Sequence, residues 1–334
     1  MLSCLAVIAP SLARGQDKKF TDPLVVPGAD PWVVRQGDWY YYTDTRVNRI
    51  DLRRSKTLAG LRDAEVRTIW KAPAAGPNSR SVWAPELHFI KERWFLYYTA
   101  TDEHETDATR RIFVLESESA DALGAWRDRG KLAVPAADDA YAIDGTLFQR
   151  RDGKLYFLWS GREKSEGGPQ NIYIAEMENA WTLRSPRVRI STPEHDWEKH
   201  GWAVNEGPQV LERGDRLFVI YSGSGYSTPN YCLGQLENRG GNLLDASAWR
   251  KSAEPVFSSL LDGPKKVYGP GHCAFFQSPD GREDWIICHA RDFEDLRRRP
   301  RNVRAQRFQW NAGGEPVFGP PIAPDVLLDA PSGE

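Results

Sequence analysis

The chain has 334 residues, with 44 basic and 46 acidic side chains and a formal net charge of −2 at pH 7. This balance gives no support to a nucleic acid or an anionic membrane as the partner, because both select strongly basic surfaces. The aromatic content is high, at 13 Trp, 12 Tyr and 13 Phe against only 2 Met. Tyr and Trp favour β-strands, and Trp rings also pack on sugar rings, so the composition indicates a β protein with carbohydrate as one candidate ligand.

The chain begins with a short apolar segment, MLSCLAVIAPSLARGQ. Its apolar core and the small residues Ser11 and Ala13 are typical of a secretory signal peptide, although the positively charged start of such a peptide is missing. We expect residues 1–21 to be a truncated signal peptide or a disordered leader, and the protein to be secreted or periplasmic. A leader that does not function as a signal would instead leave it in the cytoplasm.

An aromatic run recurs five times along the rest of the chain, at spacings of 55, 61, 62 and 68 residues. Its copies are DWYYYTDT, RWFLYYTAT, KLYFLWSGR, RLFVIYSGS and DWIICHARD, which begin at Asp38, Arg93, Lys154, Arg216 and Asp284. One strand-like run precedes each copy and two follow it, so each unit holds four strands. The repeat predicts an all-β fold, a five-bladed β-propeller of antiparallel strands over residues 22–325, followed by a short tail at 326–334.

The run that precedes each copy carries an ionisable residue. These runs are GADPWVV, APELHFI, IDGTLFQ, NEGPQVL and GPGHCAFF, with Asp30, Glu86, Asp144, Glu206 and His272. The first strands of propeller blades surround the central channel, so we expect these residues to meet at one mouth of it. Ionisable groups gathered in a cleft usually mark a functional site.

Several carboxylates close together suit three chemistries: glycoside hydrolysis, binding of a hard cation, and aspartyl proteolysis. Trp32, Trp83 and Trp202 lie beside the acids in the sequence. Because tryptophan offers a flat apolar face with a polar edge, these residues favour a sugar ring over a peptide as the ligand.

The five runs, in this order and at this spacing, resemble glycoside hydrolase family 43, and the likeness covers about Asp22 to Pro321. The segments IYIAEMENAWTLRSPRVRISTPEHDWE and SAWRKSAEPVF resemble its exo-acting α-L-arabinofuranosidase branch. The resemblance implies a five-bladed propeller that releases terminal α-L-arabinofuranose from arabinan, arabinoxylan or arabino-oligosaccharides. A β-D-xylosidase, a β-D-galactofuranosidase and an endo-arabinanase are the alternatives on the same scaffold. A non-catalytic sugar-binding propeller is a further alternative, but it is expected to have lost at least one acid.

The resemblance also implies a role for each acid. Asp30 would be the general base that takes a proton from the attacking water, and Glu206 the general acid that protonates the leaving oxygen. Asp144 would hold Glu206 in place and raise its pKa by like-charge proximity. Because an inverting enzyme leaves room for a water, the Asp30 and Glu206 carboxyls are expected roughly 6.5–9.5 Å apart. Glu86 is not one of the three family acids, and we interpret it as structural or as lining a subsite.

Further site residues follow from the same resemblance. His272 matches a family histidine near a central cation, commonly calcium, which it would reach through water. Trp32, Trp83 and Asn205 are candidate sugar contacts, and Arg304 falls near a family arginine that enters the pocket. The structural alternatives are that the tryptophans fill the core between blades and that Asn205 caps a turn.

The four cysteines are Cys4, Cys232, Cys273 and Cys288, and no pair has the CxxC spacing of a zinc site. Cys4 belongs to the expected leader. We expect the other three to be small buried hydrophobic residues, with one disulfide as the alternative.

Overall fold

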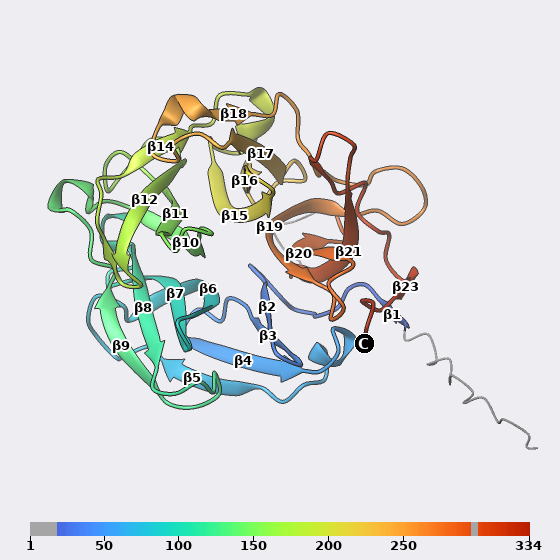
Figure 1. Cartoon of the computed structure of the whole chain (residues 1–334), viewed down its shortest axis with the longest axis horizontal. Coiled ribbons are helices and arrows are strands. Elements are labelled where there is room, and N and C mark those ends of the chain that lie inside the picture. The colour runs from blue at the N-terminus through green and yellow to red at the C-terminus, as the bar shows by residue number, and fades with distance from the viewer. Residues whose placement is uncertain (1–18, 295–299) are drawn as a thin grey trace, which may run out of the picture.

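The computed structural model describes residues 19–294 and 300–334, and over these ranges the chain forms a five-bladed β-propeller (Figure 1). All strand pairs within the blades are antiparallel, and the blades surround a common centre. This confirms the fold class predicted from the sequence. Residues 1–18 of the expected leader lie outside the described residues.

Each blade takes its strands from one continuous stretch of chain, from the centre outward. Blade 1 consists of β2 (Trp32–Gln36), β3 (Trp39–Thr43), β4 (Arg49–Ser55) and β5 (Arg67–Lys71), and blade 2 of β6 (Arg80–Ile90), β7 (Arg93–Thr101), β8 (Arg111–Ser117) and β9 (Trp126–Lys131). Blade 3 consists of β10 (Ala142–Gln149), β11 (Leu155–Gly161), β12 (Asn171–Asn179), β13 (Thr182–Leu183) and β14 (Val188–Ser191). In blade 3 both β13 and β14 pair with β12.

Blades 4 and 5 have the regular four strands. Blade 4 consists of β15 (Asn205–Arg213), β16 (Arg216–Gly223), β17 (Cys232–Arg239) and β18 (Trp249–Lys251). Blade 5 consists of β19 (Tyr268–Gln277), β20 (Asp284–Arg291), β21 (Asn302–Trp310) and β22 (Pro316–Val317). Short 3-10 helices lie in the connections: η1 (Ala59–Leu61), η2 (Asp107–Thr109), η3 (Ala136–Asp138), η4 (Asp196–Glu198) and η5 (Ala246–Ala248).

The recurring aromatic runs form the second strand of each blade, namely β3, β7, β11, β16 and β20. Almost every side chain in these strands is buried. A strand that is covered on both faces by neighbouring blades is apolar throughout and does not alternate, which explains the pattern in the sequence. The apolar cluster between blades 1 and 5, for example, contains Tyr40, Tyr42, Phe276 and Trp285.

The two ends of the described chain pair with each other at the junction of blades 1 and 5. Strand β1 (Lys19–Thr21) is antiparallel to β23 (Leu327–Asp329), with Phe20 opposite Leu328. Phe20 is buried in the cluster that joins blades 1 and 5. This pair of strands lies on either side of the predicted propeller range 22–325. Strands of three residues are too short to show a period in the sequence.

Cys232, Cys273 and Cys288 are free and buried, as expected for small hydrophobic residues. Cys273 and Cys288 lie opposite each other in β19 and β20 but form no disulfide. Within the described ranges, no helix has the length and apolar character to cross a membrane.

Candidate active site

In every blade, a residue at the matching place in the inner strand, or two residues before it, has the left-handed backbone conformation. These residues are Asp30 (φ 54°), Ala84 (φ 42°), Asp144 (φ 54°), Gly207 (φ 54°) and His272 (φ 46°). In blades 2 to 5 the pairing between first and second strand shifts register at this place. A β-bulge turns the local side chains out of the ladder, and left-handed backbone at non-glycine residues is strained and concentrates at functional sites.

The bulges define which residues are equivalent, and they correct the alignment made from the sequence. Asp30, Asp144 and His272 occupy the left-handed position itself. Glu206 lies one residue before that position, and Glu86 lies two residues after it. The five ionisable residues are therefore not equivalent, because spacing alone does not show on which residue a bulge falls.

Glu86 consequently lies in a different layer of the channel from the other acids. Its carboxyl accepts a hydrogen bond from Gln209 Nε2 at 2.6 Å and interacts with Thr146, both of which also follow a left-handed residue by two positions. His88 Nε2 lies 3.2 Å from its other oxygen. Burial raises the pKa of Glu86 well above its usual value, which favours its neutral form, and Glu86 does not line the pocket that holds the other acids.

At four of the five blade junctions, an acceptor at the end of the second strand, or in the loop just after it, binds the backbone N–H of the next blade's left-handed residue. Thr99 Oγ1 accepts the backbone N–H of Asp144 at 3.2 Å, and Ser222 Oγ accepts that of His272 at 2.8 Å. Where blade 5 meets blade 1, the acceptor is His289 Nδ1, which takes the N–H of Asp30 at 3.1 Å. These bonds hold the backbones of three site residues in place.

The mouth of the channel opens into a pocket of about 350 Å³, a size that suits a small ligand. Asp30, Asp144, Glu206 and His272 line it, together with aromatic residues that include Trp83 and Trp202. The structure therefore brings together three carboxyl groups and a histidine from four blades, beside two indole rings.

Asp30 is held in its ionised form. Arg301 Nη1 donates to its Oδ1 at 2.6 Å, and Thr45 Oγ1 donates to its Oδ2 at 2.7 Å. Burial acts to raise the pKa of Asp30, but the charges of Arg301, His272 and His289 and the Thr45 hydroxyl outweigh it and lower the pKa well below 3.8. An ionised carboxylate of this kind can accept a proton.

Glu206 is in the opposite state. Burial is the largest influence on its pKa, and together with the charge of Asp30 it raises the pKa to about 7, although Tyr231 and Gln170 act to lower it. Asp144 is also buried, and burial followed by repulsion from Glu206 and Asp30 raises its pKa well above the usual value. Asp144 Oδ2 accepts the backbone N–H of Gly207 at 3.0 Å, which fixes the peptide next to Glu206.

Both oxygens of the Glu206 carboxyl have a partner. Tyr231 Oη donates to Oε1 at 2.9 Å, and Gln170 Nε2 donates to Oε2 at 3.0 Å. The Gln170 amide is oriented by Ser160, whose hydroxyl donates to the Asn205 carbonyl and accepts from Gln170 Nε2. Because an amide nitrogen can only donate, Oε2 is an acceptor whether or not Glu206 is protonated.

Three stacked rings connect the surroundings of Glu206 with those of Asp30. The Tyr231 ring lies parallel to His289, with 5.6 Å between centroids and 4° between planes, and His289 in turn stacks on His272. Because His289 Nδ1 accepts the N–H of Asp30, its proton lies on Nε2 and the ring is neutral. The stack fixes the relative positions of the groups that contact the two carboxyls.

The family described as Glycosyl hydrolases family 43 matches residues 21–316. The chain belongs to glycosyl hydrolase family 43.

Relatives of known activity show the same similarity. The "extracellular exo-alpha-(1->5)-L-arabinofuranosidase" of Streptomyces avermitilis is 39% identical over 318 residues, covering 92% of this chain and 64% of that protein. A protein of the same description from Streptomyces chartreusis is 40% identical over 296 residues, covering 87% of this chain and 88% of that one. The chain thus spans slightly less than two thirds of the Streptomyces avermitilis relative.

A solved structure shows that the similarity extends to the fold. The crystal structure of an α-L-arabinofuranosidase from Lactobacillus brevis has a TM-score of 0.85 and is 37% identical, with 92% of this chain and 98% of that chain covered. The five-bladed arrangement of this family 43 chain is therefore found in a protein with that activity.

Two residues expected to contact sugar do not line the pocket of this family 43 chain, and this corrects the sequence interpretation. Asn205 is fully buried, its Nδ2 donates to Glu198 Oε1 at 2.7 Å, and its Oδ1 accepts from Ser191 Oγ at 2.6 Å. Its side chain points away from that of Glu206, as strand alternation requires. Trp32 packs on the apolar clusters between blades and lies 4.7 Å from the His88 ring.

Arg304 also lies elsewhere, and another arginine takes the expected place. The Arg304 guanidinium is buried and bonds to Asn302 Oδ1 and to Asp292. Arg301 lines the pocket and contacts Asp30. The sequence around residue 300 contains several arginines, and aligning any one of them with the family arginine shifts the alignment by only a few residues. The sequence alone therefore could not show which arginine enters the pocket.

The sequence interpretation missed Thr45, Gln170, Tyr231, His289 and Arg301, which lie in loops or second strands outside the inner-strand motifs. One feature of the sequence could have pointed to His289. Thr99 in the second aromatic run and Ser222 in the fourth accept the next blade's N–H, whereas His289 accepts it in the fifth run. A histidine in place of a hydroxyl residue in a repeat indicates an additional role.

The central cation expected from the resemblance would lie beside His272. His272 Nδ1 lies 3.6 Å from Asp30 Oδ1 and 3.9 Å from Asp144 Oδ2. In the described part of the chain, no group of three or more His, Cys, Asp or Glu side chains is arranged to hold a metal ion directly. Direct coordination does not fit, and calcium held through water remains a prediction.

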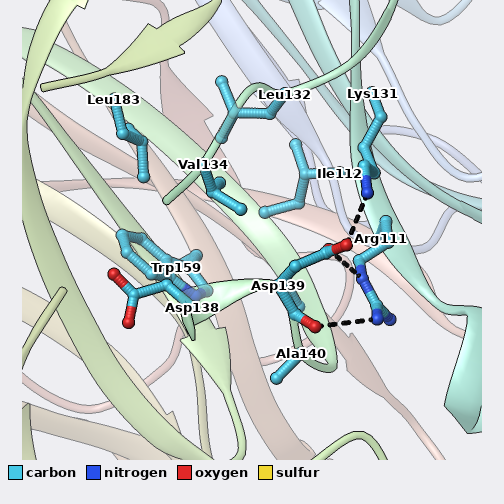
Figure 2. Close-up of a pocket in the computed structure, with 11 residues that line it drawn as sticks. Arg111, Ile112, Lys131, Leu132, Val134, Asp138, Asp139, Ala140, Trp159 and Leu183 are labelled. Carbon is cyan, nitrogen blue, oxygen red and sulfur yellow. Dashed lines mark hydrogen bonds and ion pairs between the residues drawn. The ribbon is translucent and has the colours of Figure 1, made fainter. Parts of the chain in front are cut away.

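A second, much smaller cavity of about 20 Å³ lies between blades 2 and 3 (Figure 2). Both of its carboxylates are already paired, Asp139 with Arg111 and Lys131, each at 2.6 Å, and Asp138 with Arg187 at 3.4 Å. The space suits about one water molecule, and none of its lining residues lines the pocket that holds the acids. We assign it no substrate.

Proposed function

We propose that the protein is an inverting glycoside hydrolase that releases terminal α-L-arabinofuranosyl residues from arabinan, arabinoxylan or arabino-oligosaccharides. The observation that supports this most strongly is the pair of oppositely tuned carboxyls in one pocket. Asp30 is ionised, whereas the pKa of Glu206 is raised to about 7. Acid–base hydrolysis of a glycoside requires one carboxyl in each state.

In the proposed reaction, Asp30 takes one proton from a water molecule while the oxygen of that water attacks the anomeric carbon. Glu206 gives its proton to the glycosidic oxygen as the bond between carbon and leaving oxygen breaks. The products are a free sugar of inverted configuration and the shortened alcohol. Asp30 ends protonated and Glu206 ionised, and proton exchange with solvent restores both.

The choice of sugar rests on similarity. The two Streptomyces relatives and the Lactobacillus brevis structure are arabinofuranosidases by description. Trp83 and Trp202 supply flat apolar faces at the pocket, and Arg110 stacks on Trp83 with its guanidinium carbon 3.7 Å from the ring centroid, which holds that indole in place.

Two measurements test the proposal. Proton NMR of the first product from an aryl α-L-arabinofuranoside should show the β-anomer, and a retained α-anomer would exclude inversion. In a panel of aryl α-L-arabinofuranoside, β-D-xyloside and β-D-galactofuranoside, we expect the highest kcat/KM for the first. A preference for either of the others would overturn the sugar assignment, and the Asp30→Asn variant, prepared identically, controls for contaminating hydrolases.

We further propose a calcium ion held through water near His272, and no catalytic step is assigned to it. EDTA should then lower the melting temperature and calcium should restore it, whereas an unchanged melting temperature would argue against the ion. Export of the protein is also proposed, from the apolar N-terminal segment and the relatives described as extracellular. Cell fractionation with N-terminal sequencing of the product tests it.

A further inference from the structure

We propose that a groove beside the pocket binds the leaving part of the substrate, an uncharged sugar unit, with Trp202 as its stacking surface. The proposal rests on the proposed function and deepens it. The groove measures about 530 Å³ and is lined by Arg162, Gly168, Pro169, Gln170, Pro193 and Trp202, with Ala203. It shares Arg162, Gln170 and Trp202 with the pocket that holds the acids, so the two spaces adjoin.

The position of Glu206 determines which part of the substrate enters the groove. A general acid must lie beside the oxygen that it protonates, so the leaving sugar lies on the Glu206 side of the pocket. Gln170 Nε2 contacts Glu206 Oε2 at 3.0 Å, and Gln170 also lines the groove. Asp30 lines the pocket but not the groove, and its partners Arg301 and His289 belong to blade 5. The leaving sugar therefore extends from the acid into the groove, away from the base.

The groove is rigidly built. The backbone N–H of Gln170 donates to the Ala203 carbonyl at 3.2 Å, and the N–H of Asn205 donates to the Gln170 carbonyl at 2.9 Å. The loop before β12 is thereby bonded to the segment that leads into β15. A ligand in the groove finds a formed surface, so little binding free energy is lost in ordering it.

Trp202 is fixed in position yet accessible. Its indole ring packs against Gly225, where an added Cβ would lie 3.2 Å from ring atoms, and Tyr226 meets it edge-on with centroids 6.0 Å apart. Gly225 N–H donates to the His200 carbonyl at 2.8 Å, which joins the two loops. Even so, 44% of Trp202 is exposed. A large aromatic side chain that is fixed in position but accessible to solvent is typical of a binding surface.

The charges in the groove favour a neutral ligand. Arg162 is the one charged residue in its lining, and Arg162 Nη1 donates to Asp107 Oδ2 at 2.7 Å while its guanidinium stacks on the Tyr141 ring. Because Arg162 is paired with Asp107, its positive charge is already neutralised and offers little attraction to an acidic sugar. The apolar face of Trp202 and the two prolines suit the carbon–hydrogen face of an uncharged sugar.

The test compares two substrates that share the terminal sugar and differ in the leaving group. Arabinobiose with an α-(1→5) linkage fills the groove, whereas the methanol that leaves from methyl α-L-arabinofuranoside is too small to reach it. For Trp202→Ala we expect kcat/KM on arabinobiose to fall about tenfold relative to kcat/KM on the methyl glycoside, a typical value for a lost stacking surface. Trp39→Ala, in β3 of blade 1 and remote from the groove, should leave the ratio unchanged.

The outcomes separate this proposal from the proposed function. Equal losses on both substrates, or none, overturn the groove assignment while the hydrolase assignment stands. If the wild type acts on another terminal sugar, the arabinofuranosidase assignment fails, and the same pair of methyl glycoside and disaccharide is measured for that sugar. Calorimetric binding of arabinobiose to Asp30→Asn, with and without Trp202→Ala, gives a readout without turnover. Unchanged affinity there would also overturn the proposal.

Discussion

Asp30 and Glu206 differ in the groups that surround them, although both are buried in one pocket. Asp30 has a guanidinium and a hydroxyl on its oxygens, and these stabilise its charge by more than burial opposes it. Glu206 has two neutral donors, which do not offset burial and the negative charge of Asp30. The protonation states therefore follow from neighbours on other blades and loops, since Asp and Glu have similar pKa values in water.

The first prediction at this scale concerns Tyr231. Its hydroxyl stabilises the ionised form of Glu206, so Tyr231→Phe should raise the pKa of Glu206 above its value of about 7. A general acid acts in its protonated form, and activity is lost as pH rises through that pKa. The basic limb of kcat/KM against pH should therefore move to higher pH in the variant.

The control for this prediction is Tyr97→Phe. Tyr97 is equally buried and its hydroxyl donates to the Ala180 carbonyl at 2.6 Å, away from the pocket. It should change stability without moving the pH profile. A basic limb that stays in place in Tyr231→Phe, or moves to lower pH, would show that Tyr231 does not tune Glu206.

The second prediction separates the roles of the two acids. Glu206→Gln should lower kcat/KM on arabino-oligosaccharides by about 10²-fold or more, and much less on aryl glycosides whose leaving group needs no proton. Asp30→Asn should abolish turnover of both, because water activation is needed whatever the leaving group. Similar losses on the two substrates in both variants would contradict the assignment.

At the scale of the element, the bulged inner strand determines where the acids lie. A regular strand points successive side chains to opposite faces. A left-handed residue interrupts this alternation and turns the local side chain toward the channel mouth. Asp30, Asp144 and His272 occupy this strained position, and in blade 4 it is occupied by Gly207, next to Glu206. The positions of four site residues thus depend on the same left-handed backbone conformation.

The third prediction tests this device at Gly207. Its φ is 54°, and an added Cβ would lie 3.1 Å from His272 Nδ1. Gly207→Ala should destabilise the fold by roughly 1 kcal/mol from backbone strain, with a further loss from the contact, and should lower kcat by displacing Glu206. Urea denaturation and steady-state kinetics measure the two effects.

Gly214→Ala is the matched control. Gly214 has a similar φ of 65° in the hairpin between β15 and β16, but an added Cβ has no atom within 4 Å. It should carry the backbone strain alone and keep full activity. If both variants kept full activity, the bulge in blade 4 would not be needed to position Glu206.

At the scale of the whole molecule, the ring of blades is closed by contacts between the ends of the chain. Phe20 lies in the apolar cluster that joins blades 1 and 5, and β1 pairs with β23. The site depends on this closure, because Asp30 belongs to blade 1 whereas His289 and Arg301, which contact it, belong to blade 5.

The fourth prediction concerns this closure. Phe20→Ala should lower the free energy of unfolding by about 3–5 kcal/mol, since it leaves a cavity between two blades. Leu327→Ala lies on the same two-stranded sheet, but 61% of Leu327 is exposed, so its effect should stay within about 0.5 kcal/mol. The urea midpoints of the two variants measure the difference, and equal midpoints would show that the closure contributes little.

The repeat made the fold predictable, and with it the meeting of Asp30, Asp144, Glu206, His272 and Trp83 in one pocket. Each of these residues lies on an inner strand or next to one, so knowing the order of strands was enough to bring them together. Trp32, Asn205 and Arg304 were misplaced for a common reason. Whether a side chain points into the pocket depends on the bulge and on loop alignment, and neither can be read from spacing.

The blades follow from the amino-acid pattern alone, because an apolar strand between charged turns keeps its pattern in every copy whatever its surroundings. The pattern also put Asp30, Asp144, Glu206 and His272 at converging inner strands, but it did not separate Glu86 from them. Their protonation states follow from the tertiary structure, because Arg301, Tyr231 and Gln170 reach them from separate loops. It likewise decided that Trp202 forms one side of a groove that adjoins Glu206. Such proximity arises from the closure of the ring, and residues far apart along the chain carry no local sign of it.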